Sequence, residues 1–244
     1  MLLQILTYTH HLTTMLFGIF LSAFFLGVKQ NKKNVCILLG GGAVSGLFFL
    51  ICNTVFGSLF TEAVYPIFVH LPLFLLLVFY YRFRWLPSII SIMTAYLCCQ
   101  FSNWAGIFAL SLSGLDWVYY LVRIIVTVAV FAFLSRYLCQ TTALLLAKSD
   151  RELYILGAMP FVYYVFDYST TKFSMLLYSG NKVVVEFLAF AMCISYVIFL
   201  FVYFQEYELK NRAEQYGQLT NMQLNSLHSE IEQVRSSEHR MKIL

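Results

Sequence analysis

The feature that most constrains this chain is a series of apolar runs, each about twenty residues long and almost free of charge. The run 35–56 contains no charged side chain at all. A helix rises about 1.5 Å per residue, so a run of this length matches the hydrocarbon core of a bilayer. Hydrophobic residues make up 60% of the chain and charged residues 11%, whereas a soluble domain carries about a quarter charged residues. The sequence therefore predicts an integral membrane protein.

Seven such runs are separated by charged or turn-forming residues, and we expect each to form a membrane-spanning helix. The predicted fold class is all-α, a polytopic transmembrane bundle of about seven helices followed by a cytoplasmic coiled-coil helix. Six spans are the alternative, because the dense apolar part of the first run is confined to 15–28. The expected spans are 5–28, 35–56, 63–81, 86–110, 117–138, 153–171 and 183–204.

Lysine and arginine are unevenly divided between the two ends of these spans. One end receives the charged tail and the cations of three loops, which are Lys29, Lys32, Lys33, Arg82, Arg84, Arg136, Lys148 and Arg151. The other end receives only Lys172 and Lys182, together with Glu62 and Asp116. Cytoplasmic loops carry an excess of lysine and arginine. We therefore expect a multi-pass cell-membrane protein with its N-terminus outside and its C-terminus in the cytoplasm.

The last forty or so residues form a polar tail with a helical repeat. Apolar side chains recur there at three-four spacing, as in the seam of a coiled coil. No proline interrupts 183–244, so the last span is expected to continue into the tail. We predict two domains, a transmembrane domain (1–204) and a dimeric coiled-coil helix (205–244), with a solvated amphipathic helix as the alternative for the tail. The predicted seam is Leu224, Leu227, Ile231, Val234 and Met241.

Polar side chains are expected in one layer in the outer half of the bundle. Counting residues from the outer ends of the spans places polar groups from five spans at similar depth. Ionisable groups inside a bilayer are costly and usually mark function or internal pairing, and Asp167 and Glu186 are the candidate partners of Arg123. We interpret the layer as a ligand pocket, with a polar clamp between helices as the alternative. The candidate ligand-binding residues are His70, Gln100, Asn103, Arg123, Tyr164, Asp167 and Glu186.

The sequence offers little for catalysis, metal binding or nucleic-acid binding. The six cysteines are scattered without a CxxC pair, so no metal site is expected. His70 with Cys98 or Cys99 is a weak nucleophile–base pair, because the cysteines lie at least a turn deeper. The sequence has no glycine-rich phosphate-binding loop, so it gives no indication of a nucleotide cofactor. It also has no basic stripe with interleaved aromatics, so it gives no indication of nucleic-acid binding.

Three stretches resemble the sensor regions of GHKL-type histidine kinases, which are multi-span receptors related to peptide-pheromone quorum-sensing kinases. They are AYLCCQFSNW (95–104), PFVYYVFDYSTTKF (160–173) and EIEQVRSSEHRMKIL (230–244). The resemblance implies the membrane sensor module of a two-component system, a homodimer that detects an extracellular cue such as a short peptide. A small-molecule transporter or permease-like protein is the alternative, although no internal repeat supports it.

The same resemblance implies where the kinase chemistry lies. In that family the tail leads into an Arg-His-Asp phosphoacceptor motif and then an ATP-binding domain. Neither His228 nor His239 stands in an Arg-His-Asp context, so no catalytic residue is expected within these 244 residues. ATP and Mg²⁺ are expected only for a kinase half beyond Leu244, and a cytoplasmic response regulator is the implied downstream partner.

Overall fold

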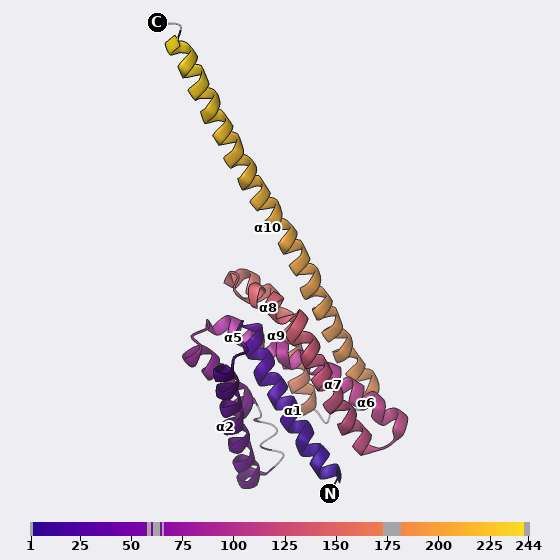
Figure 1. Ribbon diagram of the computed structural model, residues 1–244. Helices are drawn as coiled ribbons and strands as arrows, with labels where there is room; N and C mark the ends of the chain where they lie inside the picture. The colour runs from indigo at the N-terminus through magenta and orange to yellow at the C-terminus, as the bar shows by residue number, and fades with distance from the viewer. Residues whose placement is uncertain (1, 58–59, 61–63, 65, 173–181, 242–244) are drawn as a thin grey trace. The chain divides into compact units, whose positions relative to one another are not determined.

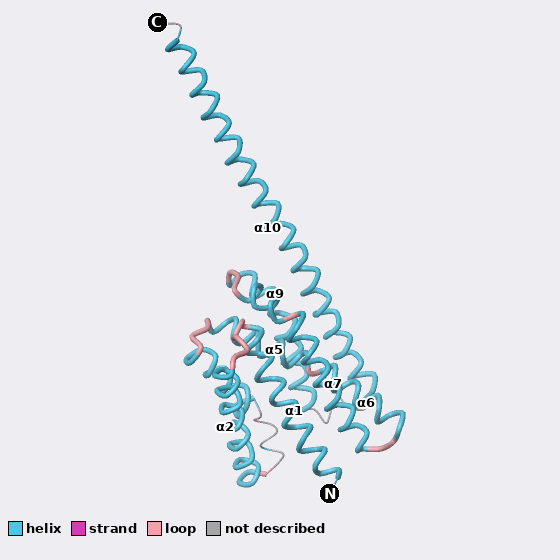
Figure 2. Tube along the Cα trace, viewed as in Figure 1, coloured by secondary structure: helices cyan, strands magenta, loops and turns pink. Residues whose placement is uncertain are grey.

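The computed structural model describes residues 2–57, 60, 64, 66–172 and 182–241. Within these ranges side chains are described from residue 3 to residue 167 and again from 190 to 232. The described residues are 91% helical. This part of the chain contains no strand (Figure 2). The predicted all-α fold class is confirmed.

The helices follow the expected runs closely. Each expected span coincides with one helix, with part of one or with a consecutive group of helices, and residues 139–146, which lie between the fifth and sixth expected spans, form the short helix α8. The third span is a composite in which two π-helical stretches flank one α-helical turn. In chain order (Figure 1) the elements are α1 (Leu2–Phe25), α2 (Lys32–Phe56), π-helix η1 (Pro66–His70), α4 (Leu71–Leu75), π-helix η2 (Leu76–Tyr80), α5 (Trp85–Cys98), α6 (Gln100–Ser113), α7 (Asp116–Tyr137), α8 (Cys139–Leu146), α9 (Asp150–Lys172) and α10 (Lys182–Met241).

Several helices are long and apolar enough to cross a membrane. Among the described residues these are Lys32–Phe56, Trp85–Ser113, Asp116–Tyr137 and Phe190–Glu232. Helices α1 and α9 are 24 and 23 residues long, but polar residues such as His10 and Asp167 lower their hydropathy. A membrane location is therefore supported, whereas the count of seven spans stays a prediction.

The chain divides into two compact units, Met1–Ile198 and Phe199–Leu244. In the first unit α1 packs against α7 and α5, α6 packs against α7, and α5 packs against α9. The second unit consists of the C-terminal part of α10. The roles assigned to 1–204 and 205–244 stay predictions.

The first unit buries one set of apolar side chains and leaves another set exposed. Leu21, Leu97 and Leu134 are almost fully buried. Ile125 and Val128 on α7 are 58% and 55% exposed. So much exposed hydrocarbon is unfavourable in water, but it is what a helix presents to lipid.

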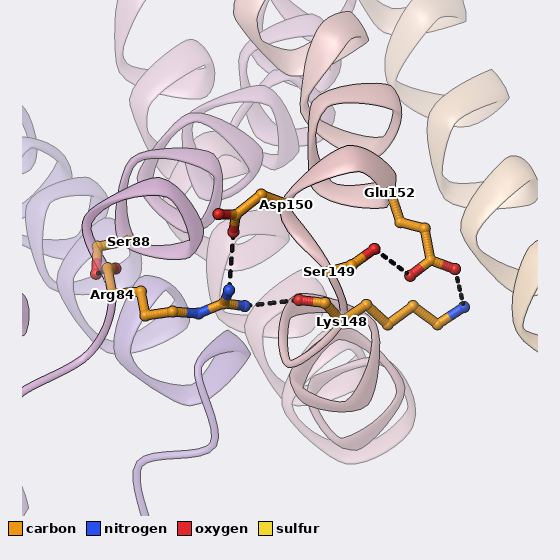
Figure 3. A network of polar contacts seen from close by, with 6 residues as sticks. All are labelled: Arg84, Ser88, Lys148, Ser149, Asp150 and Glu152. Carbon is orange, nitrogen blue, oxygen red and sulfur yellow. Dashed lines mark hydrogen bonds and ion pairs between the residues drawn. The ribbon is translucent and has the colours of Figure 1, made fainter.

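Three loops that carry cations lie together at one end of this unit. Gly27 follows α1 and lies against α8. A Cβ atom added to Gly27 would be 3.5 Å from the Cβ atom of Ala143 on α8. Arg84, which precedes α5, donates from Nη1 to Oδ1 of Asp150 over 2.8 Å and from Nη2 to the carbonyl of Lys148 over 2.6 Å (Figure 3). These contacts place the loop after η2 beside the loop after α8, and the loop after α1 beside helix α8.

A short polar network stabilises the start of α9 at the same end. Glu152 accepts a hydrogen bond from the Ser149 hydroxyl (3.0 Å) and forms an ion pair with Lys148 (3.4 Å), as Figure 3 shows. The Ser149 hydrogen bond lowers the pKa of Glu152, and the positive charge of Lys148 acts in the same direction. Carboxylates in the first turn of a helix also interact favourably with its dipole.

Candidate ligand-binding cavity

A cavity of about 290 Å³ lies inside the first unit, between α1, η1, α5, α6, α7 and α9. Most of the residues singled out from the sequence as ligand-binding meet at this one place, although they come from four separate segments. Tyr164 lies on a neighbouring cavity, and the side chain of Glu186 is outside the described residues. The predicted residues that line the first cavity are His70, Gln100, Asn103, Arg123 and Asp167.

Asp167 enters the cavity from α9 and is held by a tyrosine of α5. The Tyr96 hydroxyl donates a hydrogen bond to Oδ2 of Asp167 over 2.5 Å. A hydrogen bond to the charged form of a carboxylate stabilises that form in an apolar environment. The two helices approach closely because α9 has Gly157 at their contact, where a Cβ atom would lie 2.7 Å from Cγ1 of Ile90.

Arg123 reaches the cavity from α7. Its Nη1 donates to the Tyr119 hydroxyl one turn earlier, and its Cζ lies 5.2 Å from the centre of the Tyr119 ring. Its Nε is buried and has no hydrogen-bond partner among the described residues. The described ion pairs include none between Arg123 and Asp167. The side chain of Glu186, the other candidate partner, lies outside the described residues.

A glycine of α6 makes room for the Arg123 side chain. A Cβ atom added to Gly106 would lie 2.4 Å from Cγ of Arg123, 2.8 Å from its Cδ and 3.1 Å from Cδ2 of Tyr119. Real Cβ atoms essentially never come closer than 3.0 Å to another side chain, so the first two of these distances require Arg123 to move. The Arg123 side chain can therefore follow its observed path because Gly106 has no side chain.

His70 lies between this polar cavity and a second, apolar cavity of about 350 Å³. The second cavity is open at the surface of the unit, where its lining residues Ile67 and Leu71 are 53% and 45% exposed. His70 and Ile92 border both cavities. On the apolar side Nδ1 of His70 is hydrogen-bonded to the Tyr164 hydroxyl at 2.8 Å. The His70 ring also lies nearly perpendicular to the ring of Tyr96, which lines the polar cavity, with 5.7 Å between the ring centres. His70 ends the π-helix η1, and π-helical turns frequently occur at functional sites.

Sequence reasoning missed two contributions to the polar cavity. One is Tyr96, which shares a helix face with Gln100 and Asn103 through spacings of four and three. The other is helix α1, where Thr14, Gly18 and Ser22 recur every four residues along the wall. In both cases the residues recur at helical spacing in the sequence. This spacing did not point to a cavity, because small polar residues are also common at helix contacts in membranes.

The cysteines near the cavity do not form a metal centre in the described part of the chain. No group of three or more His, Cys, Asp or Glu residues able to hold a metal ion is found among the described residues. Cys98 is buried. Cys99 lines the cavity and donates from Sγ to the Ala95 carbonyl over 3.4 Å.

The predicted seam of the tail is helical in the described structure. Leu224, Leu227 and Ile231 are 58%, 55% and 62% exposed on the single chain, while the side chains of Val234 and Met241 are outside the described residues. Exposed apolar residues at this spacing are what a second helix would cover. The dimeric coiled coil stays a prediction.

No protein-family model, curated protein or solved structure matches this chain. The resemblance to GHKL sensor regions rests on the three stretches quoted above and stays an expectation.

Proposed function

We propose that this chain is the membrane sensor of a two-component histidine kinase. An extracellular cue enters the cavity of the first unit, and helix α10 transmits its effect to a kinase domain that lies outside these residues. The observation that carries the proposal is the polar cavity itself, lined by Arg123, Asp167 and His70 within an apolar helical bundle. Ionisable groups are retained at such places mainly for function.

Helix α10 supports the transmission step because it is a single helix of 60 residues that contributes to both units. Within the first unit its Phe190 ring stacks on Trp104 at 4.4 Å, and its Tyr196 hydroxyl donates to the Leu156 carbonyl over 3.0 Å. Trp104 and Leu156 belong to α6 and α9, two helices that also line the cavity.

The mechanism we propose is a shift between two packings of these helices. A ligand that binds one packing more tightly than the other changes their populations. Small shifts or rotations of a helix are a common means of carrying such a change. In the proposed homodimer α10 would pass the change along its coiled coil, and the downstream kinase would use ATP and Mg²⁺ to phosphorylate a response regulator.

A transporter is the second candidate, and one observation favours it. The third expected span is broken into η1, α4 and η2, and the helix after it is interrupted at Cys99. Interrupted helices at a polar site are typical of transporters. The two proposals differ in whether the cavity opens to one side of the membrane or alternately to both.

Labelling of native cysteines distinguishes the two candidates. Cys99 lines the cavity, whereas Cys36 is exposed on α2 near its predicted cytoplasmic end. A membrane-impermeant thiol reagent is applied to intact cells and to inverted vesicles, and modified peptides are identified by mass spectrometry. The sensor proposal expects Cys99 to react from outside only and Cys36 from the cytoplasmic side only. Reaction of Cys99 from both sides supports a transporter, and reaction from the cytoplasmic side alone contradicts the sensor.

A further inference from the structure

One end of the first unit carries more positive charge than its own acids neutralise. The acids at this end are already engaged, since Asp150 pairs with Arg84 and Glu152 pairs with Lys148. Four exposed cations in or next to the α1–α2 and η2–α5 connections take part in none of the described ion pairs. We call them the cationic surface, and they are Lys29, Lys32, Lys33 and Arg82.

Helix packing brings the two connections to the same end of the unit. Helix α2 packs against η1 and α4, and a Cβ atom added to Gly41 would lie 3.4 Å from Cδ2 of Leu76. Gly41 belongs to the first half of α2, and Leu76 begins η2, the last helical element before Arg82. The start of α2, with Lys32 and Lys33, is therefore at the same end as Arg82 (Figure 1).

Aromatic rings border the cationic surface. Tyr80 and Trp85 stand on either side of Arg82 in the sequence and are 50% and 57% exposed. Tyrosine and tryptophan gather where a membrane meets water, because each has an apolar ring and a polar group. Their presence indicates that the cations lie at the level of the lipid head groups.

The two lysines at the start of α2 are in an unfavourable place unless a negative charge is close. They belong to the first turn of the helix, which contains no acidic residue. A cation there is repelled by the positive end of the helix dipole. A phosphate group next to Lys32 and Lys33 offsets this repulsion.

We propose that the cationic surface binds the head group of an anionic phospholipid such as phosphatidylglycerol. Arg82 donates paired hydrogen bonds to phosphate oxygens, Lys32 and Lys33 add positive charge, and Trp85 contacts the upper part of the acyl chains. A zwitterionic head group brings its own cation to this surface, whereas an anionic one brings only negative charge. The inference goes beyond the proposed sensor function, because it concerns the surrounding membrane and not the cavity.

Tryptophan fluorescence tests the proposal, because one of the three tryptophans lies on this surface. Trp104→Phe with Trp117→Phe leaves Trp85 alone, and Trp85→Phe with Trp104→Phe leaves Trp117, at the predicted outer start of α7. Each full-length protein is placed in phosphatidylcholine vesicles that contain a fixed fraction of brominated phosphatidylglycerol or brominated phosphatidylcholine. Bromine quenches tryptophan at short range, so quenching reports which lipid lies next to each ring.

The expected result is a lipid preference at one end of the unit only. Contact with one lysine or arginine strengthens the association of an anionic lipid about fivefold. Brominated phosphatidylglycerol should therefore associate at Trp85 at least about fivefold more strongly than brominated phosphatidylcholine. At Trp117 the two lipids should quench equally.

Variants of the protein that retains only Trp85 assign the preference to particular cations. Arg82→Gly should reduce it about fivefold, and Arg82→Lys, which keeps the charge, should reduce it less. Glycine suits this position because φ of Arg82 is 59°, in the left-handed region. Arg84→Gln with Asp150→Asn is the matched control, since it removes a paired arginine from the same connection at constant net charge and should retain the preference. Circular dichroism establishes that each variant is folded.

Four results overturn the inference. They are equal quenching of Trp85 by the two lipids, an equal preference at Trp117, a loss in the Arg84–Asp150 control as large as in Arg82→Gly, and loss of the preference when inorganic phosphate is added at constant ionic strength. The last result would assign the surface to a soluble phosphate. All four leave the sensor proposal intact, because thiol labelling of the cavity tests it separately.

Discussion

Arg123 is the residue on which the cavity depends most. Its guanidinium lies in an apolar bundle, where its described partners are the ring and the hydroxyl of Tyr119. Cation–π contacts compensate only part of the cost of removing an arginine from water. The remaining cost is tolerable where an anion binds, which is why we place the ligand beside it.

Replacing Gly106 by alanine tests the path of this arginine. The added methyl group would overlap Cγ of Arg123, so the side chain or helix α6 must move. Overpacking of this kind costs about 1–3 kcal/mol of stability. Thermal unfolding of the purified protein measures the loss. Gly40→Ala is the matched control, because nothing lies within 4 Å of its added Cβ, and an equal loss in both variants would contradict the proposed packing.

Removing the Tyr96 hydroxyl tests the support of Asp167. Tyr96→Phe keeps the ring but deletes the 2.5 Å hydrogen bond to the carboxylate. A hydrogen bond to a charged group contributes about 1.5–3 kcal/mol, so stability is expected to fall by this order in a denaturation measurement. Tyr8→Phe, at a hydroxyl-bearing ring that is 71% exposed, provides the comparison. If Tyr96→Phe were as stable as Tyr8→Phe, Asp167 would not depend on Tyr96.

At the level of single residues, the sequence predicted which polar groups would gather but not how they are bonded. Depth along each helix follows from residue counting, which is why His70, Gln100, Asn103, Arg123 and Asp167 meet as expected. Which polar groups bond to each other depends instead on how each helix is rotated about its axis and on the angles at which the helices cross. The periodicity of the sequence determines neither of these. Residue counting therefore left both Asp167 and Glu186 open as partners of Arg123. The described ion pairs include none with Asp167, and pairing with Glu186 stays a prediction.

At the level of helices, the contact between α5 and α9 positions both Tyr96 and Asp167. Gly157→Ala introduces a Cβ atom 2.7 Å from Cγ1 of Ile90. We expect a loss of about 1–3 kcal/mol in thermal or denaturant unfolding. The double variant Gly157→Ala with Ile90→Ala is expected to lose less than the sum of the two single changes, because the clash is removed. Simple additivity would show that the two helices do not meet there.

The ion pair between Arg84 and Asp150 is expected to contribute little. Both side chains are largely exposed, at 49% and 62%, and exposed ion pairs contribute about 0–1 kcal/mol. Arg84→Gln should therefore change the unfolding temperature only slightly. A large loss would show that the two loops are held mainly by this contact.

The positions of the helices were predictable because apolar runs of bilayer length are distinctive in sequence. The π-helical stretches η1 and η2 were not, since their apolar composition is the same as that of an α-helix. Helix α8, which lies between the fifth and sixth expected spans, was not predicted. Its eight residues are too few to give a clear periodic signal.

For the whole molecule, composition alone predicted a helical membrane protein, and helices of sufficient length and hydropathy agree with it. The fold of the first unit could not be derived in the same way. Lipid-facing and buried positions are both apolar, so hydrophobicity does not distinguish one face of a helix from another. The proposed function rests on the cavity and on α10, for which the sequence provided candidate residues but no geometry.

Cysteine cross-linking along the tail tests the central claim that the cavity controls a dimeric α10. Single cysteines are placed at each position from 222 to 232, in wild type and in Asp167→Asn, and disulfide formation is measured in membranes against the background of the native cysteines. The account predicts maxima at Leu224, Leu227 and Ile231 in wild type, and a shifted profile at equal membrane abundance in Asp167→Asn. Identical profiles in the two proteins, or no cross-linking in either, would contradict it.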